Sequence, residues 1–92
     1  MKYCCDNFQW SIQSIGKKGM AIIPTKIGEY NCFVIQSRSN DKTMSHDSNN
    51  IAQQTIRFCP WCGKKLADLI MEDMGGFILL ETENKDFILP SP

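Results

Sequence analysis

The sequence Cys59-Pro60-Trp61-Cys62-Gly63 constrains the fold of this chain more than any other feature, and residues 59–63 are called the knuckle below. A Cys-x-x-Cys turn brings two sulfurs to one side of the backbone, where both can bind a zinc ion at about 2.3 Å. Pro60 fixes φ directly after the first thiol and so bends the turn. Gly63 can adopt a positive φ, which lets backbone N–H groups point back at the thiolates. The motif therefore predicts half of a metal site.

Cys4 and Cys5, far away at the N-terminus, supply the other candidate pair of thiols. A structural zinc ion needs four ligands, so a second pair is required. Neighbouring side chains of an extended strand point to opposite faces, so both thiols reach one ion only if the backbone bends there. In the alternative, one thiol binds the metal and the other packs beneath Phe8 or Trp10.

Two further side chains are substitute ligands, Cys32 and His46. Cys32 lies in an apolar run, where a cysteine is more often a small buried side chain than a ligand. His46 lies in a polar segment, where a solvated histidine is the simpler interpretation. Five cysteines without an apolar signal segment indicate metal or redox chemistry rather than a disulfide framework.

A chain of 92 residues forms one domain at most. The core of so small a domain rarely supplies more than about 3–5 kcal/mol, so an additional cross-link of some kind is expected. The formal net charge is zero, which removes the long-range field that attracts proteins to phosphate backbones. No stretch approaches the length of a membrane span, and we expect a cytoplasmic protein without membrane association.

The pattern of apolar residues predicts short antiparallel strands in the first half of the chain. Alternation predicts a strand over residues 8–12, and apolar runs predict strands over 20–23, ended by Pro24, over 32–35, and over 55–58 leading into the knuckle. Residues 37–50 are almost wholly polar and are expected to form a mobile loop.

After the knuckle the period changes to that of a helix. Leu66, Leu69, Ile70 and Met74 form one apolar stripe, which Gly75-Gly76 is expected to end. Two apolar runs then predict a C-terminal hairpin. The expected fold is one α+β domain over residues 1–92: a zinc-stapled antiparallel sheet of short strands, one helix after the knuckle, and a hairpin that completes an extension over residues 66–92.

A leading Cys-Cys followed by an aromatic residue, then a strand that ends in Cys-Pro-Trp-Cys-Gly-Lys-Lys-Leu, resembles small zinc-ribbon-like proteins of bacteria and their phages. The resemblance covers residues 4–8 and 56–66. It implies one zinc ion held by Cys4, Cys5, Cys59 and Cys62. It implies no activity, because zinc ribbons serve many functions.

The main competing interpretation is redox chemistry by Cys59 and Cys62. A strand, a Cys-Pro-Trp-Cys motif and a helix are also the local order of glutaredoxin-like proteins, where the helix lowers the pKa of the first thiol. Gly63 suits a metal knuckle better, and only thirty residues follow Cys62, too few for the rest of that fold. A dithiol oxidoreductase is therefore kept as a distant alternative.

For function the sequence leaves two non-enzymatic hypotheses. The first is a protein-interaction module, an adaptor or regulator, in which the apolar tail that includes Phe77 and Phe87 meets a partner protein or a second copy. The second is a nucleic-acid-binding ribbon, in which a basic cluster lies beside an aromatic ring that stacks on a base. The residues of that second surface are Arg57, Trp61, Lys64 and Lys65.

Overall fold

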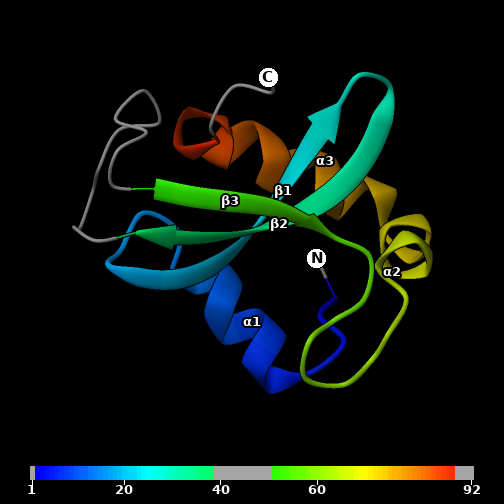
Figure 1. Ribbon diagram of the computed structural model, residues 1–92. Coiled ribbons are helices and arrows are strands. Elements are labelled where there is room, and N and C mark those ends of the chain that lie inside the picture. Colours follow the sequence, from blue (N-terminus) through cyan, green and yellow to red (C-terminus); the bar gives the residue numbers. More distant parts are fainter. Residues whose placement is uncertain (1, 39–50, 89–92) are drawn as a thin grey trace.

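The computed structural model describes residues 2–38 and 51–88 of the chain. It is a small α+β fold, as predicted, and Figure 1 shows its elements in order. These elements are helix α1 (Asp6–Gln13), strands β1 (Gly19–Ile27), β2 (Tyr30–Arg38) and β3 (Ile51–Ile56), helices α2 (Leu66–Glu72) and α3 (Met74–Asn84), and the 3-10 turn η2 (Lys85–Phe87). The candidate ligand His46 and residues 39–50 of the predicted loop lie outside the described residues, whereas Ser37 and Arg38 belong to β2.

The described strands form one antiparallel sheet in the order β1-β2-β3. Ile22 pairs with Ile35 across β1 and β2, and Phe33 pairs with Ile56 across β2 and β3. The predicted end of the first strand at Pro24 is wrong, because β1 continues through Pro24 to Ile27. An edge strand tolerates proline, since one of its sides needs no N–H donor for the sheet.

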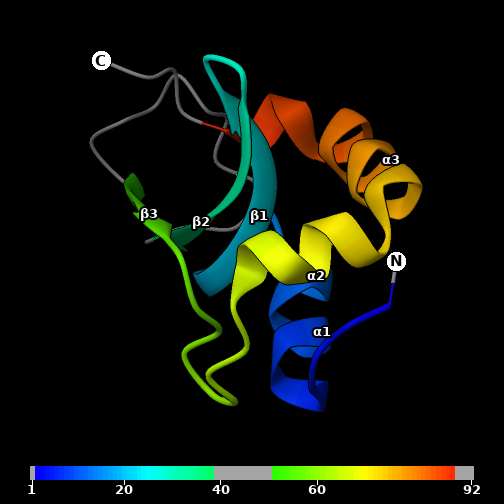
Figure 2. The same ribbon diagram turned by 90° about the vertical axis from the view of Figure 1, so that its right-hand side faces the viewer.

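The helices gather on one side of the sheet, as Figure 2 shows in side view. The Phe33 ring at the centre of the sheet packs edge-to-face against Phe8 of α1 at 5.2 Å and against Phe77 of α3 at 5.3 Å, between ring centroids. All three rings are fully buried. Such aromatic contacts add about 0.5–1.5 kcal/mol per pair beyond the burial of area, so these rings hold both helices on the sheet.

The predicted strand over residues 8–12 is wrong, since the segment lies in α1. The buried side chains of α1 are Phe8, Ser11 and Ile12, which follow the spacing of a helix, while Trp10 is 62% exposed. The Ser11 hydroxyl donates to the Phe8 carbonyl, so the one polar residue on the buried face is satisfied within the helix. The alternation of Phe8, Trp10 and Ile12 that indicated a strand is therefore accidental.

The predicted C-terminal hairpin is also wrong, because helix α3 and η2 occupy its place. Gly75 and Gly76 do not end a helix but lie in the first turn of α3. Helix α2 ends one residue before Asp73, whose carboxylate then accepts a hydrogen bond from the Gly76 N–H at 3.1 Å. A side-chain oxygen at this position satisfies a backbone donor that the helix leaves free, so Asp73 starts a new helix.

The end of the described chain is fastened to polar side chains of β2. Gln36 and Arg38 both donate to the carbonyl oxygen of Phe87, at 2.7 and 3.0 Å, and the Arg38 guanidinium lies 5.5 Å from the centre of the Phe87 ring. Gly16 approaches the same ring so closely that an added Cβ would lie 2.8 Å from it. Gly16 also has a φ of 84°, so both the backbone conformation and the nearby ring require a residue without a side chain here.

None of the helices in the described part of the chain is both long and apolar enough to cross a lipid bilayer.

Candidate metal centre

The knuckle is held in shape by its own backbone. The Cys59 N–H donates to the Lys64 carbonyl at 2.9 Å, and the Gly63 N–H donates to the Cys59 carbonyl at 3.0 Å. Gly63 has a φ of 78°, as the sequence predicted for this position. Phe58 and Lys65 then form an isolated antiparallel bridge that closes the hairpin around the turn. The two knuckle thiols are thus positioned by local backbone hydrogen bonds.

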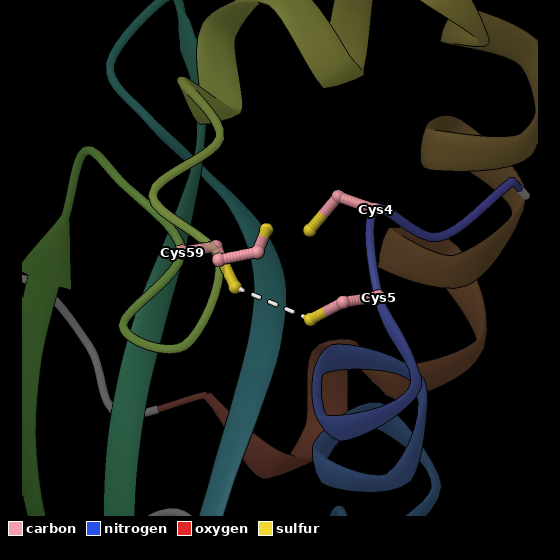
Figure 3. Close-up of side chains that lie close together, drawn as sticks. Cys4, Cys5 and Cys59 are labelled. Atoms are coloured by element: carbon pink, nitrogen blue, oxygen red, sulfur yellow. Dashed lines mark hydrogen bonds between the residues drawn. The ribbon is translucent and has the colours of Figure 1, made fainter.

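The N-terminal pair precedes α1 directly. Cys5 occupies the N-cap position in an extended conformation, and its carbonyl accepts the first hydrogen bond of the helix from the Gln9 N–H. The sulfurs of Cys4 and Cys5 both point from this segment towards Cys59 in Figure 3. The backbone bends between the extended residues and the helix, which lets neighbouring side chains face the same way. Both residues are half-buried, and both of their sulfurs belong to the cysteine cluster.

The structure brings together the Sγ atoms of Cys4, Cys5, Cys59 and Cys62, all within 4.8 Å of one another. The sulfurs of Cys5 and Cys59 lie 3.7 Å apart. Four sulfurs at the corners of a tetrahedron, each about 2.3 Å from a zinc ion, lie about 3.8 Å from one another. A disulfide would need about 2.05 Å, and all five cysteines are free thiols. The cluster could therefore hold a metal ion, and its ligand type and number suit a tetrahedral site.

The thiols of this cluster differ in pKa. Burial raises the pKa of Cys4, and its hydrogen bonds to the sulfurs of Cys62 and Cys59 raise it further. The Lys64 backbone N–H donates to the sulfur of Cys62 and, together with the Cys4 thiol, lowers the pKa of Cys62 to about 7. Cys62 therefore ionises more readily than Cys4.

A second backbone amide acts on Cys5. Burial raises the pKa of the Cys5 thiol, and the Phe8 N–H at the start of α1 opposes that shift by a hydrogen bond to the sulfur. Amide donors from Lys64 and Phe8 therefore reach one sulfur of each pair. Such donors offset the excess negative charge of a site with four thiolates.

One side of the cluster is part of the hydrophobic core and the other faces solvent. Cys59 is 3% exposed and packs among buried residues that include Phe8 and Leu69, whereas Cys62 is exposed. At the outer side, Lys64 forms an ion pair with Glu72 at 2.7 Å. A metal in this position would join the segment before α1 to the segment before α2, and both helices pack on the same sheet.

The remaining candidate residues are distributed over different environments. Cys32 is half-buried and is not a member of the cysteine cluster, and Arg57 and Lys65 are exposed near the knuckle. Trp61 is 39% exposed. Phe77 is fully buried, so its predicted place on an interaction surface is wrong.

Phe87 is half-buried against Gly16 and Arg38 rather than presented to solvent. The sequence-based interpretation missed two other exposed aromatic residues, Tyr30 at 80% and Phe58 at 56% exposure. Both flank the sheet end nearest the knuckle, and the fold was needed to show that they share one surface.

No protein-family model, curated protein or solved structure matches this chain. The interpretation of the cysteine cluster therefore rests on its own chemistry and geometry.

Proposed function

We propose that this chain is a non-enzymatic zinc-binding module in which Cys4, Cys5, Cys59 and Cys62 hold one structural zinc ion. The observation that carries the proposal is the approach of all four Sγ atoms to within 4.8 Å. A zinc ion with four protein thiolates keeps no open position for a substrate, whereas catalytic zinc sites use three protein ligands. The metal then supplies folding free energy rather than chemistry.

The module acts, in this proposal, through protein–protein interaction on the outer face of α2 and α3. Exposed apolar side chains lie there at the end of α2 and along α3: Met71 at 76%, Met74 at 40%, Ile78 at 51% and Leu79 at 59% exposure. Helix α3 buries Phe77 on its inner side and still presents apolar residues outward. A helix that is apolar on both sides is usually covered on both sides, which favours a partner protein or a second copy here.

Two measurements test the proposal. Elemental analysis of protein purified under reducing conditions should find one zinc ion per chain, and cobalt substitution should give the intense sulfur-to-cobalt charge-transfer bands of four thiolates. Sedimentation equilibrium should show association that Ile78→Glu abolishes and Gln9→Glu, an equal charge on an exposed position of α1, leaves intact. Absence of bound zinc would overturn the module, and a zinc-loaded monomer without any protein partner would overturn its mode of action.

A nucleic-acid-binding ribbon is the second candidate. Its support is an exposed surface on which Arg57 and Lys65 have no ion pair within the described residues, close to the exposed Phe58 ring. Lys64 no longer counts as a free cation there, because it pairs with Glu72. Retention on heparin that falls steeply with salt would favour this candidate over protein interaction.

A dithiol oxidoreductase is the distant third candidate. The lowered pKa of Cys62 is the feature that it would use. Three other sulfurs lie within 4.8 Å of that sulfur, however, and four clustered thiols favour zinc binding over disulfide exchange.

Thiolate ligands stay reduced in a reducing compartment, so we propose that the protein works in the cytoplasm.

A further inference from the structure

A pocket lies apart from the cysteine cluster, between the sheet and α2. It has a volume of about 580 Å³, within the range of pockets that bind small molecules. Its walls come from the start of β2, the end of β3 with the two residues after it, Lys65, and α2 as far as Ile70. The apolar residues of its lining include Phe33, Ile56, Leu66 and Ile70.

Two cations stand among these apolar walls. Arg57 and Lys65 both line the pocket, and no acidic side chain does. Neither cation makes an ion pair with any described residue, whereas the neighbouring Lys64 is paired with Glu72. The pocket therefore combines apolar walls with two positive charges that have no acidic partner in its lining. An apolar compound that carries an anionic group complements both features.

We propose that this pocket binds a small amphipathic carboxylate, with the carboxylate on Arg57 and Lys65 and the apolar part against the walls. A guanidinium presents parallel N–H donors that match the two oxygens of a carboxylate, which makes Arg57 the main recognition group. Tyr30 and Phe58 line the same pocket and are largely exposed, so they would cover an aliphatic chain or stack on a ring.

The pocket shares a wall with the hairpin that carries the knuckle. The Leu66 N–H donates to the Arg57 carbonyl at 2.9 Å, and Phe58 bridges to Lys65. Figure 1 shows the chain leaving β3, passing round the loop and returning into α2. A metal bound at Cys59 and Cys62 fixes this hairpin, so zinc and carboxylate should bind with positive coupling.

The test is a titration of zinc-loaded protein with octanoate and, in parallel, with the uncharged analogue 1-octanol. Calorimetry and the NMR chemical shifts of pocket residues detect the binding. We expect octanoate to bind at least about tenfold more tightly, because only the carboxylate can form charge-assisted hydrogen bonds with Arg57 and Lys65. 4-Phenylbutyrate in parallel distinguishes an aromatic from an aliphatic body. Equal binding of octanoate and octanol, or no binding of either acid, would overturn the proposal.

Variants locate the site. Arg57→Gln with Lys65→Gln should weaken octanoate binding about tenfold or more, while Lys17→Gln, a substitution of a lysine that does not line this pocket, should change nothing. Ala67→Phe fills the pocket from α2 and should abolish binding. As an independent readout, octanoate should slow the alkylation of Cys32, which lines the pocket and lies outside the cysteine cluster.

Each variant is first checked for bound zinc and for an unchanged circular dichroism spectrum, so that loss of binding is not confused with loss of fold. Binding that persists at full strength in Ala67→Phe would overturn the assignment of the pocket. Salt-sensitive binding of single-stranded DNA without any binding of carboxylates would overturn it in favour of a nucleic-acid surface. Protein that holds one zinc ion and ignores carboxylates would overturn this inference and leave the zinc module standing.

Discussion

The sulfurs of Cys5 and Cys59 lie 3.7 Å apart although 54 positions separate them in the sequence. Cys5 is the N-cap residue of α1, and Cys59 follows β3 at the start of the knuckle, so the contact joins the beginning of the first helix to the middle of the chain. Cys59 is also part of the hydrophobic core. The candidate metal site and the core are therefore one continuous structure.

Removal of one ligand should unfold the domain. Cys5→Ser is expected to lose zinc and its cooperative thermal transition, because zinc contributes about 10–16 kcal/mol in small zinc-finger peptides. The core of a chain of this size supplies only about 3–5 kcal/mol. Elemental analysis and thermal melts followed by circular dichroism measure both effects.

Cys32→Ser is the matched control, since it removes a thiol that is outside the cluster. We expect this variant to keep one zinc ion per chain and a melting transition close to that of the parent. A Cys5→Ser protein that retained stoichiometric zinc and a normal melt would show that the N-terminal pair is not part of the site.

Zinc affinity should rise with pH. Metal binding displaces the thiol protons, so each displaced proton weakens the apparent affinity about tenfold for every unit of pH decrease in the range where that thiol is protonated. Because the pKa values of Cys4 and Cys5 are raised, protons compete with zinc for these two sulfurs at neutral pH. The pKa of Cys62 is about 7, so protons compete for its sulfur only below that pH. The slope should therefore steepen below pH 7. Competition titrations against a chelator from pH 6 to pH 8 measure it, and a flat profile would argue against thiolate ligands.

The left-handed backbone of the knuckle should be sensitive to a single methyl group. Gly63→Ala is expected to destabilise the zinc-loaded protein by about 1–3 kcal/mol, because φ is 78° at this position and no neighbouring atom lies within 4 Å of the added Cβ. The cost is thus purely conformational. Denaturant midpoints measure it.

Gly75→Ala makes the same substitution where the backbone is helical, again with open space around the new Cβ. It should be neutral or stabilise by up to about 1 kcal/mol, because alanine favours a helix more than glycine does. Equal effects of the two substitutions would contradict the backbone argument.

Burial separates two phenylalanines that the sequence alone does not distinguish. Phe77→Ala should destabilise by about 3–5 kcal/mol, because the ring is fully buried against Phe33. Phe58→Ala should cost less than about 1 kcal/mol, because Phe58 is 56% exposed. Urea unfolding of the zinc-loaded variants tests this order, and its reversal would contradict the described core.

Short apolar runs limited what could be predicted of the fold. Residues 77–80 are apolar in sequence, and such a run suits a buried strand as well as a helix. The signal that favoured the helix was Asp73, a strong N-cap residue, together with the helical spacing of Phe77 and Leu80. The same ambiguity explains the strand that was predicted over residues 8–12, where the structure has α1. The contact of Phe8 with Phe33 of the sheet, which is distant in the sequence, decides which face of this segment is buried.

The sequence by itself determined the turn of the knuckle and the chemistry of its thiols. Pro60 and Gly63 act through local backbone sterics, which need no tertiary partner. Tertiary structure alone decided that Cys4 and Cys5 both face the knuckle, that the last apolar run is a helix, and that Arg57 and Lys65 share a pocket with the walls of the sheet. These are contacts between distant segments, and packing of the whole chain fixes them rather than the preference of any one segment.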